Sequence, residues 1–166
     1  MSNVCEEQIF SSVFKANSKT VFNYIYYKFG NEEKANDAVQ EAFVKLWENC
    51  AKVSPEKAKA YIYTVANNLY LNVIKAEKVR LKYADIHSKS TSNESPEFIL
   101  EEKEFKDKLD NALNDLPDNQ RTTFLLNRID GKKYAEIAKM EGVSVKAIEK
   151  RMHLALKSLR EKIDGI

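Results

Sequence analysis

Residues 134–157 read YAEIAKMEGVSVKAIEKRMHLALK, and this stretch predicts two helices joined by a tight turn. Gly142 stands where the first helix should end, at a position that favours a residue comfortable at positive φ. Ser144 follows as a candidate N-cap for the second helix. Apolar residues of the second helix recur at steps of three and four, so they share one face. They are Ile148, Met152, Ala155, Leu156, Leu159 and Ile163.

The second helix also carries a basic face. Its members are Lys146, Lys150, His153 and Lys157, with Ala147 and Arg151 beside them. In a DNA-binding helix-turn-helix, the second helix enters the major groove with its N-terminal residues against base edges. Lysine and arginine reach guanine edges or phosphates there, and Glu149 could accept from a cytosine amino group. An ordinary helical hairpin with a solvated basic face is the alternative, but the clustering of cations favours DNA binding.

Composition and charge limit the classes of protein to consider. The chain has 166 residues, of which 43% are hydrophobic and 31% charged, as in a globular protein. Four glycines and three prolines favour long helices over strands and turns. Residues 1–83 carry 12 basic and 9 acidic side chains, residues 84–118 carry 4 and 10, and residues 119–166 carry 11 and 6. Two basic blocks around an acidic segment suit two modules that face nucleic acid.

The two cysteines and the N-terminus indicate the compartment. Cys5 and Cys50 are too few for a disulfide framework and lack the spacing of a metal site, so we predict two reduced thiols. The first ten residues, MSNVCEEQIF, lack the basic start and apolar core of a signal peptide. No apolar run is long enough to span a membrane. We therefore expect a cytoplasmic protein with no direct membrane insertion.

The sequence offers no recognisable catalytic motif. Its two histidines, His87 and His153, fall in a polar stretch and on the basic helix. A Gly-rich phosphate loop, a Walker lysine, a zinc-protease motif and a nucleophile elbow are all missing. We expect neither an enzyme nor a cofactor nor a metal site.

The N-terminal half predicts three helices. Apolar positions at helical spacing lead from Ile9 to Phe29, where Gly30-Asn31 supplies C-cap chemistry, and then from Ala35 to Trp47. Ser54-Pro55 provides an N-cap and a first turn for the third helix. We interpret the ring of Trp47 as core. The polar face of the second helix is either a solvated surface or a docking face for a basic partner.

The third predicted helix combines an apolar side with an unusual surface. The apolar side consists of Ile62, Val65, Ala66, Leu69 and Val73. The surface mixes cations, aromatic rings and amides, namely Lys57, Lys59, Tyr61, Tyr63, Asn67, Asn68, Tyr70, Asn72 and Lys75. Rings can stack on unpaired bases, cations can hold phosphates and amides can read base edges. From these residues alone, tyrosines half-buried against neighbouring helices are the favoured alternative.

The C-terminal half begins after a polar stretch. Residues 87–96, HSKSTSNESP, show no periodicity and predict a flexible linker. An acid-rich helix follows and ends at Leu116-Pro117, where Asp118 can cap the next helix, which stops at Asp130-Gly131. The sequence therefore predicts an all-α protein with two small helical domains, a flexible linker and a C-terminal helix-turn-helix. We place the domains at residues 5–83 and 99–166, with the linker at 84–98.

These blocks, in this order, resemble the extracytoplasmic-function sigma factors, the small two-domain branch of the bacterial sigma-70 family. Residues 37–47, DAVQEAFVKLW, resemble the polymerase-binding helix of the family. Residues 60–68, AYIYTVANN, resemble its promoter-melting helix, although Asn67 replaces the usual arginine and Tyr61 the common tryptophan. Leu116-Pro117 and the helix-turn-helix resemble its second domain. The resemblance covers nearly the whole chain.

The resemblance implies a dissociable subunit that binds core RNA polymerase and directs promoter recognition and transcription initiation. The implied polymerase-binding residues are Asp37, Gln40, Glu41, Leu46 and Trp47. Residues 49–56 would pocket a base flipped from the melted minus-ten element. The opened single strand would contact Lys57, Lys59, Tyr61, Asn68, Asn72 and Lys75. The duplex of the minus-thirty-five element would contact Ser144, Lys146, Ala147, Lys150, Arg151 and Lys157. Many members of the family also pair with an anti-sigma factor, which is therefore a further candidate partner.

A stand-alone helix-turn-helix regulator with a helical N-terminal domain is the alternative function. Such a regulator needs a dimer interface and a palindromic site. The sequence shows no obvious coiled coil and no receiver-domain pattern. A scaffold protein that binds through its helices is disfavoured by the basic face of residues 146–157.

Overall fold

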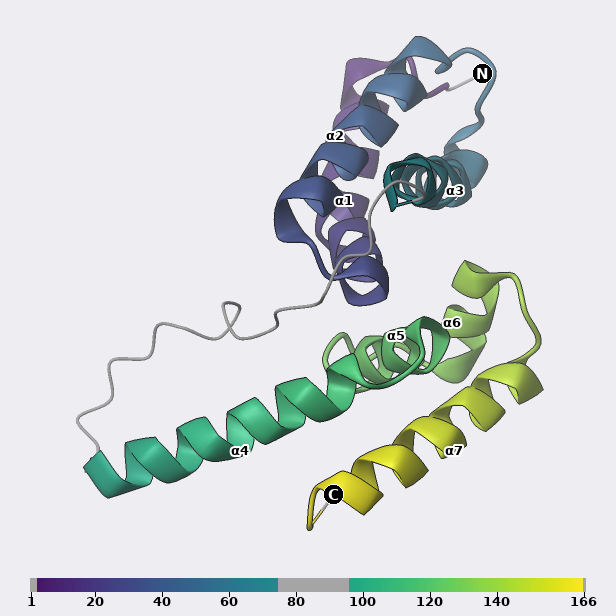
Figure 1. Ribbon diagram of the computed structural model, residues 1–166. Coiled ribbons are helices and arrows are strands. Elements are labelled where there is room, and N and C mark those ends of the chain that lie inside the picture. Colours follow the sequence, from purple (N-terminus) through teal and green to yellow (C-terminus); the bar gives the residue numbers. More distant parts are fainter. Residues whose placement is uncertain (1–2, 75–95, 166) are drawn as a thin grey trace. The chain divides into compact units, whose positions relative to one another are not determined.

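The computed structural model describes residues 3–74 and 96–165 (Figure 1). The described residues form α1 (Glu7–Phe29), α2 (Glu32–Glu48), α3 (Pro55–Ile74), α4 (Pro96–Asn114), α5 (Asp118–Arg128), α6 (Tyr134–Glu141) and α7 (Val145–Lys162). The predicted all-α class is confirmed. The chain divides into two compact units, Met1–Val79 and Arg80–Ile166. The predicted linker lies outside the described residues except for 96–98, which begin α4. Within the described ranges, no helix is both long and apolar enough to cross a bilayer.

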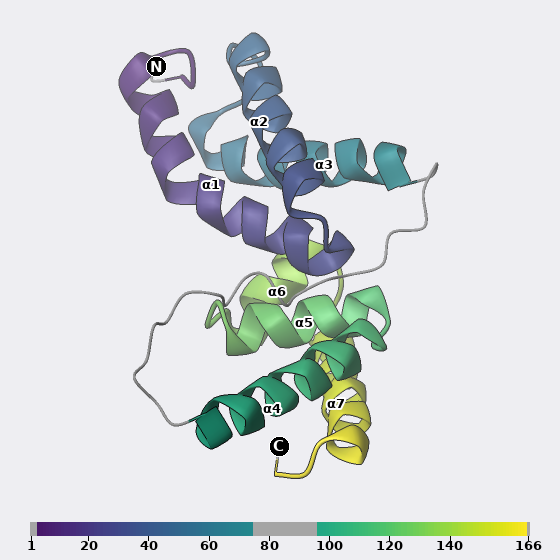
Figure 2. The same cartoon turned by 60° about the vertical axis from the view of Figure 1, so that its left-hand side comes forward.

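The first unit is a helical hairpin crossed by a third helix (Figure 2). Gly30 ends α1 with φ 75°, and its N–H donates to the Tyr26 carbonyl at 2.6 Å. Asn31 then caps α2, since its Oδ1 accepts from the Lys34 N–H at 2.9 Å. This two-residue corner folds α2 back along α1, and α3 packs on both helices. Their shared core is completely or almost completely buried and includes Val21, Ile25, Ala42, Leu46, Ile62, Ala66 and Tyr70.

Two tyrosines of α3 belong to this core. The ring of Tyr70 stacks on Phe29 with centroids 4.1 Å apart, and Tyr63 meets Tyr24 edge-on at 5.3 Å. The alternative, that the tyrosines pack against neighbouring helices, is confirmed for Tyr63 and Tyr70, although both are buried and not half-buried. The prediction that Val73 is buried is wrong, because this side chain is 44% exposed. Tyr70 stacks on Phe29, the last residue of α1. Val73 lies one turn farther along α3, beyond the end of α1, which explains its exposure.

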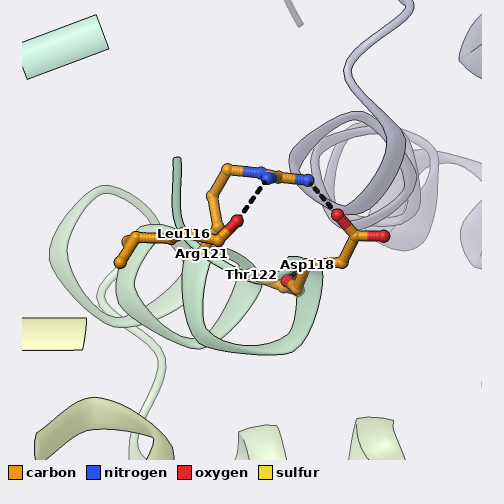
Figure 3. A network of polar contacts seen from close by, with 4 residues as sticks. All are labelled: Leu116, Asp118, Arg121 and Thr122. Atoms are coloured by element: carbon orange, nitrogen blue, oxygen red, sulfur yellow. Dashed lines mark hydrogen bonds and ion pairs between the residues drawn. The ribbon is translucent and has the colours of Figure 1, made fainter. Parts of the chain in front are cut away.

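The second unit is built around α7, which packs against α4, α5 and α6. Its core collects apolar residues from all four helices, including Leu113, Leu116, Leu126, Ile137, Ile148, Met152 and Leu159. The corner between α4 and α5 depends on a buried arginine (Figure 3). Arg121 is 2% exposed and donates from Nη1 to the Leu116 carbonyl at 3.1 Å. Its Nη2 donates to Asp118 Oδ1 at 2.8 Å.

Asp118 does not act as the predicted N-cap. Pro117 occupies the N-cap position of α5, and no side chain caps that helix. Asp118 lies in the first turn, where its carboxylate favours the positive end of the helix dipole and accepts from Arg121. Its carbonyl also accepts from the Thr122 hydroxyl at 2.7 Å. The carboxylate of Asp118 therefore pairs with the buried guanidinium of Arg121 and does not cap the helix.

The corner of the helix-turn-helix agrees with the prediction. Gly142 adopts φ 66° and ψ 33°, the left-handed conformation that ends α6. The Val143 N–H donates to the Ala138 carbonyl at 3.0 Å, which closes the turn. Ser144 caps α7, because its Oγ accepts from the Ala147 N–H at 3.1 Å.

Gly142→Ala should lower the free energy of unfolding by about 1 kcal/mol, because the left-handed conformation costs a residue with a Cβ about that much relative to glycine. A Cβ at this position would meet nothing within 4 Å, so the effect is conformational and not steric. Urea unfolding followed by far-UV circular dichroism measures it. Lys139→Ala, at an exposed position of α6, is the matched control. Equal unfolding midpoints for the two variants would contradict the role of Gly142.

Candidate protein- and nucleic-acid-binding surfaces

Burial divides α2 into an inner and an outer face. The outer face is acidic and polar, with Asp37, Gln40 and Glu41 exposed. It also carries apolar side chains, because Val44 is 55% and Trp47 is 48% exposed. The interpretation of the Trp47 ring as core is therefore wrong. Leu46 is fully buried, so it can only support this face from beneath.

Aromatic contacts from α1 hold Trp47 in place. Phe10 meets Trp47 edge-on with centroids 5.1 Å apart, and it meets Phe43 at 6.4 Å. Phe14 packs on Phe43 at 4.8 Å and remains 46% exposed. An exposed tryptophan beside an exposed aliphatic side chain is typical of the apolar centre of a protein–protein interface. Phe14 and Val44 extend this surface, and neither was predicted from the sequence to belong to it.

The segment between α2 and α3, residues 49–54, is closely tied to the end of α2. The Lys45 carbonyl accepts from the Asn49 N–H at 3.1 Å and from Asn49 Nδ2 at 2.9 Å. It also lies 3.4 Å from the Tyr61 hydroxyl of α3. Cys50 donates its N–H to the Trp47 carbonyl at 3.3 Å. This segment therefore joins the outer face of α2 to the surface of α3.

Cys50 forms a disulfide with Cys5, so the prediction of two reduced thiols is wrong. The Cα atoms are 5.0 Å apart, although 45 positions separate the two residues in the sequence. The hairpin explains their proximity. Cys5 precedes α1 and Cys50 follows α2, and the corner at Gly30 brings these two ends of the helix pair together.

The exposed side of α3 brings part of the predicted minus-ten set into one row. Lys57, Tyr61, Asn68 and Asn72 recur at helical steps, so they share a side of the helix. Lys57, Asn68 and Asn72 are exposed, and Tyr61 is half-buried. Lys59 is exposed on a different side of α3, because it lies two positions from Lys57 and Tyr61. Lys75 lies outside the described residues.

On α7, three of the predicted lysines form a second row. Lys146, Lys150 and Lys157 are exposed and recur at helical steps with His153. Ser144 and Ala147 lie at the start of the same helix. The Ser144 hydroxyl already accepts the capping hydrogen bond from the Ala147 N–H.

Arg151 departs from the predicted row. Its guanidinium is 3.8 Å from Glu141 Oε2 on α6, and the two side chains are 21% and 8% exposed. Arg151 therefore leans toward α6 and is partly engaged inside the helix-turn-helix. The pairing with Glu141 was not predicted from the sequence, because a ten-residue spacing across a turn gives no simple periodic signal for such a pair.

Two family models match this chain. The model of sigma-70 region 2 matches residues 13–80, which include α2, the segment 49–54 and α3. The model of sigma-70 region 4 matches residues 106–159, which include α5, α6 and most of α7. The chain belongs to the sigma-70 family. The surfaces on α2 and α3 thus lie in region 2 of this sigma factor, and the basic row of α7 lies in region 4.

Similar proteins include extracytoplasmic-function sigma factors, and this chain is of the same type. SigE of Mycolicibacterium smegmatis is 25% identical over 144 residues, which are 85% of this chain and 56% of the relative. SigW of Bacillus subtilis is 23% identical over 170 residues, 95% of this chain and 90% of the relative. SigV of Bacillus subtilis, an RNA polymerase sigma factor, is 27% identical over 146 residues, which are 86% of this chain and 81% of the relative. One chain of the solved RsbN–BldN complex also matches, with 22% identity and a TM-score of 0.36. The match covers 95% of this chain and 94% of the chain in the complex.

Proposed function

We propose that this sigma factor docks on core RNA polymerase through the outer face of α2 and contacts promoter DNA through α3 and α7. It acts as the specificity subunit in the cytoplasm, where polymerase and chromosome are found. One observation carries the proposal. The exposed rows of α2, α3 and α7, which the core of neither unit needs, lie within the matches to regions 2 and 4.

The polymerase-binding surface consists of Asp37, Gln40, Glu41 and Trp47, with Leu46 beneath it. Carboxylates around an exposed tryptophan suit a partner that is basic at its rim and apolar at its centre. Trp47 supplies the apolar contact area, and Phe10 limits the positions its ring can take. Val44 adds to the same apolar patch.

The minus-ten element meets α3 and the segment before it. Lys57 and Lys59 hold phosphates of the opened strand, and Asn68 and Asn72 hydrogen-bond to it, with Lys75 at the end of the set. Residues 49–56 pocket the flipped base. Capture of an extruded base offsets part of the unstacking energy, which is a few kcal/mol per step.

The minus-thirty-five element meets the N-terminal half of α7 in its major groove. Lys146 and Lys150 reach base edges or phosphates, and Lys157 contacts phosphate farther along the helix. Ser144 and Ala147 face the groove at the helix start. Arg151 acts from the side of α6, where Glu141 orients its guanidinium.

The two DNA-binding modules are residues 5–83 and 96–166, because α4 already begins at Pro96, and residues 84–95 connect them. Size-exclusion chromatography with and without core polymerase tests this function against the alternative of a stand-alone regulator. The sigma factor should elute as a monomer alone and with the polymerase when both are present. A dimer that ignores polymerase would support the stand-alone regulator instead.

Tyr61→Ala should reduce promoter opening by about five- to 150-fold, because base–aromatic stacking contributes about 1–3 kcal/mol. Binding of the closed complex should change little, since the bases are still paired there. Permanganate footprinting measures opening. Tyr61→Phe is the matched control, because it keeps the ring and removes only the hydroxyl that lies 3.4 Å from the Lys45 carbonyl. Normal opening by Tyr61→Ala would remove Tyr61 from the mechanism.

A further inference from the structure

We propose that the Cys5–Cys50 disulfide is a reversible redox site, opened by dithiol reductants, that controls how firmly the segment 49–54 is held for promoter opening. The inference rests on the proposed function, because it assigns to this segment the capture of a minus-ten base. It concerns a covalent bond that the proposed function itself does not use.

The disulfide joins two short segments that are each anchored independently. On the N-terminal side, Val4 is fully buried, the Cys5 N–H donates to Asn3 Oδ1 at 2.9 Å, and the Glu6 N–H donates to the Asn3 carbonyl at 3.2 Å. This folded turn gives the bond a fixed support. On the other side, Cys50 is the second residue of the segment between α2 and α3.

The bond determines how much of the segment is free to move. Ala51 and Lys52 are exposed, and Val53 is 8% exposed. With the disulfide in place, the two exposed residues are held between Cys50 and the buried Val53. After reduction, the segment keeps the hydrogen bonds of Asn49 and Lys52 to α2 and to each other, but it loses its covalent link to the N-terminal turn.

Both cysteines are half-buried, so neither residue is fully enclosed by the core. Transcription takes place in a compartment where dithiol systems keep most cysteines reduced, and disulfides found there are usually transient or redox-sensing. One thiolate of the reductant attacks a sulfur of the bond and forms a mixed disulfide. Its second thiol then displaces the protein sulfur. Two electrons and two protons pass to Cys5 and Cys50, and the reductant becomes a disulfide. Oxidation by a disulfide reverses the exchange.

The oxidised form should open promoters better than the reduced form. A segment held at both ends is pre-organised, so it loses less conformational entropy when a base enters. We expect a three- to tenfold difference in opening at equal occupancy of polymerase. Docking on polymerase should be the same in both forms, because Phe10 holds Trp47 through the packing of α1 on α2, which does not depend on the bond.

The test uses the full chain with core polymerase and a promoter found by run-off transcription on genomic fragments. The protein is equilibrated with graded ratios of reduced and oxidised dithiothreitol, and its redox state is measured by thiol alkylation and mass spectrometry. Permanganate footprinting then measures opening, and size-exclusion chromatography measures polymerase binding. Trp47, the only tryptophan of the chain and three positions before Cys50, reports reduction through its fluorescence.

The control is Cys5→Ser combined with Cys50→Ser, checked for folding by circular dichroism. Opening by wild type should fall three- to tenfold on reduction, to the level of the double variant, and the double variant should ignore the reductant. Equal opening by the oxidised and reduced wild type, with polymerase bound in both, would overturn the redox proposal alone. A bond that excess dithiothreitol cannot open would overturn it as well. If neither form bound polymerase, the proposed function itself would fail.

Discussion

Replacing Gln40 and Glu41 together with arginine should weaken binding to core RNA polymerase by about thirtyfold or more. Both side chains are exposed on the outer face of α2, so the change does not disturb the core. If the partner surface is basic, the variant places like charges across the interface, and such juxtapositions cost several kcal/mol. Titration of labelled sigma factor with core polymerase measures the dissociation constant.

The chain offers a closely matched control on α1. Glu7 and Gln8 are also exposed, and changing both to arginine alters the net charge by the same amount on the same unit. That control should bind polymerase within about twofold of wild type, in line with most surface substitutions. If both double variants bound equally well, the outer face of α2 would not be the docking surface.

Replacing Lys150 and Lys157 together with alanine should weaken holoenzyme binding to promoter duplex and flatten its salt dependence. Each phosphate contact contributes about 0.9 to the slope of log K against log salt, so the slope should fall by about two. The effect should be similar at different promoters if these cations hold phosphates. Filter binding at several salt concentrations measures both quantities.

Lys162→Ala is the control for this pair. Lys162 lies at the end of α7, and its Nζ donates to Asp115 Oδ2 at 2.7 Å. Because this cation is already paired within the protein, its replacement should leave the salt slope unchanged. Arg151→Ala is less suitable, because it would also remove the ion pair with Glu141, whose side chain is only 8% exposed, and so affect stability too. An unchanged slope in the lysine double variant would exclude these two side chains from the DNA contact.

Local chemistry made the helix-turn-helix predictable. Gly142 and Ser144 act through their own backbone and side-chain preferences, and neither depends on a distant partner. The same holds for Gly30 and Asn31 at the corner of the first unit. The helical spacing alone is enough to separate the buried tyrosines of α3 from the exposed side of the helix. Tyr63 and Tyr70 fall in step with buried Ala66, whereas Tyr61 does not.

Features that depend on packing between helices were less predictable. The ring of Trp47 was interpreted as core, yet it stays partly exposed beside Phe10 of α1, which meets it edge-on. The disulfide requires residues 45 positions apart to meet, which the hairpin achieves. Its position could have been inferred by folding the two predicted helices back on each other at Gly30. Composition alone indicated free thiols.

Run-off transcription with core polymerase on genomic fragments, with and without this protein, tests the central claim most directly. The account predicts that the protein adds discrete start sites that core polymerase does not use alone. It also predicts that these start sites disappear when Gln40 and Glu41 are replaced with arginine. An identical transcript pattern with and without the wild-type protein would contradict the account.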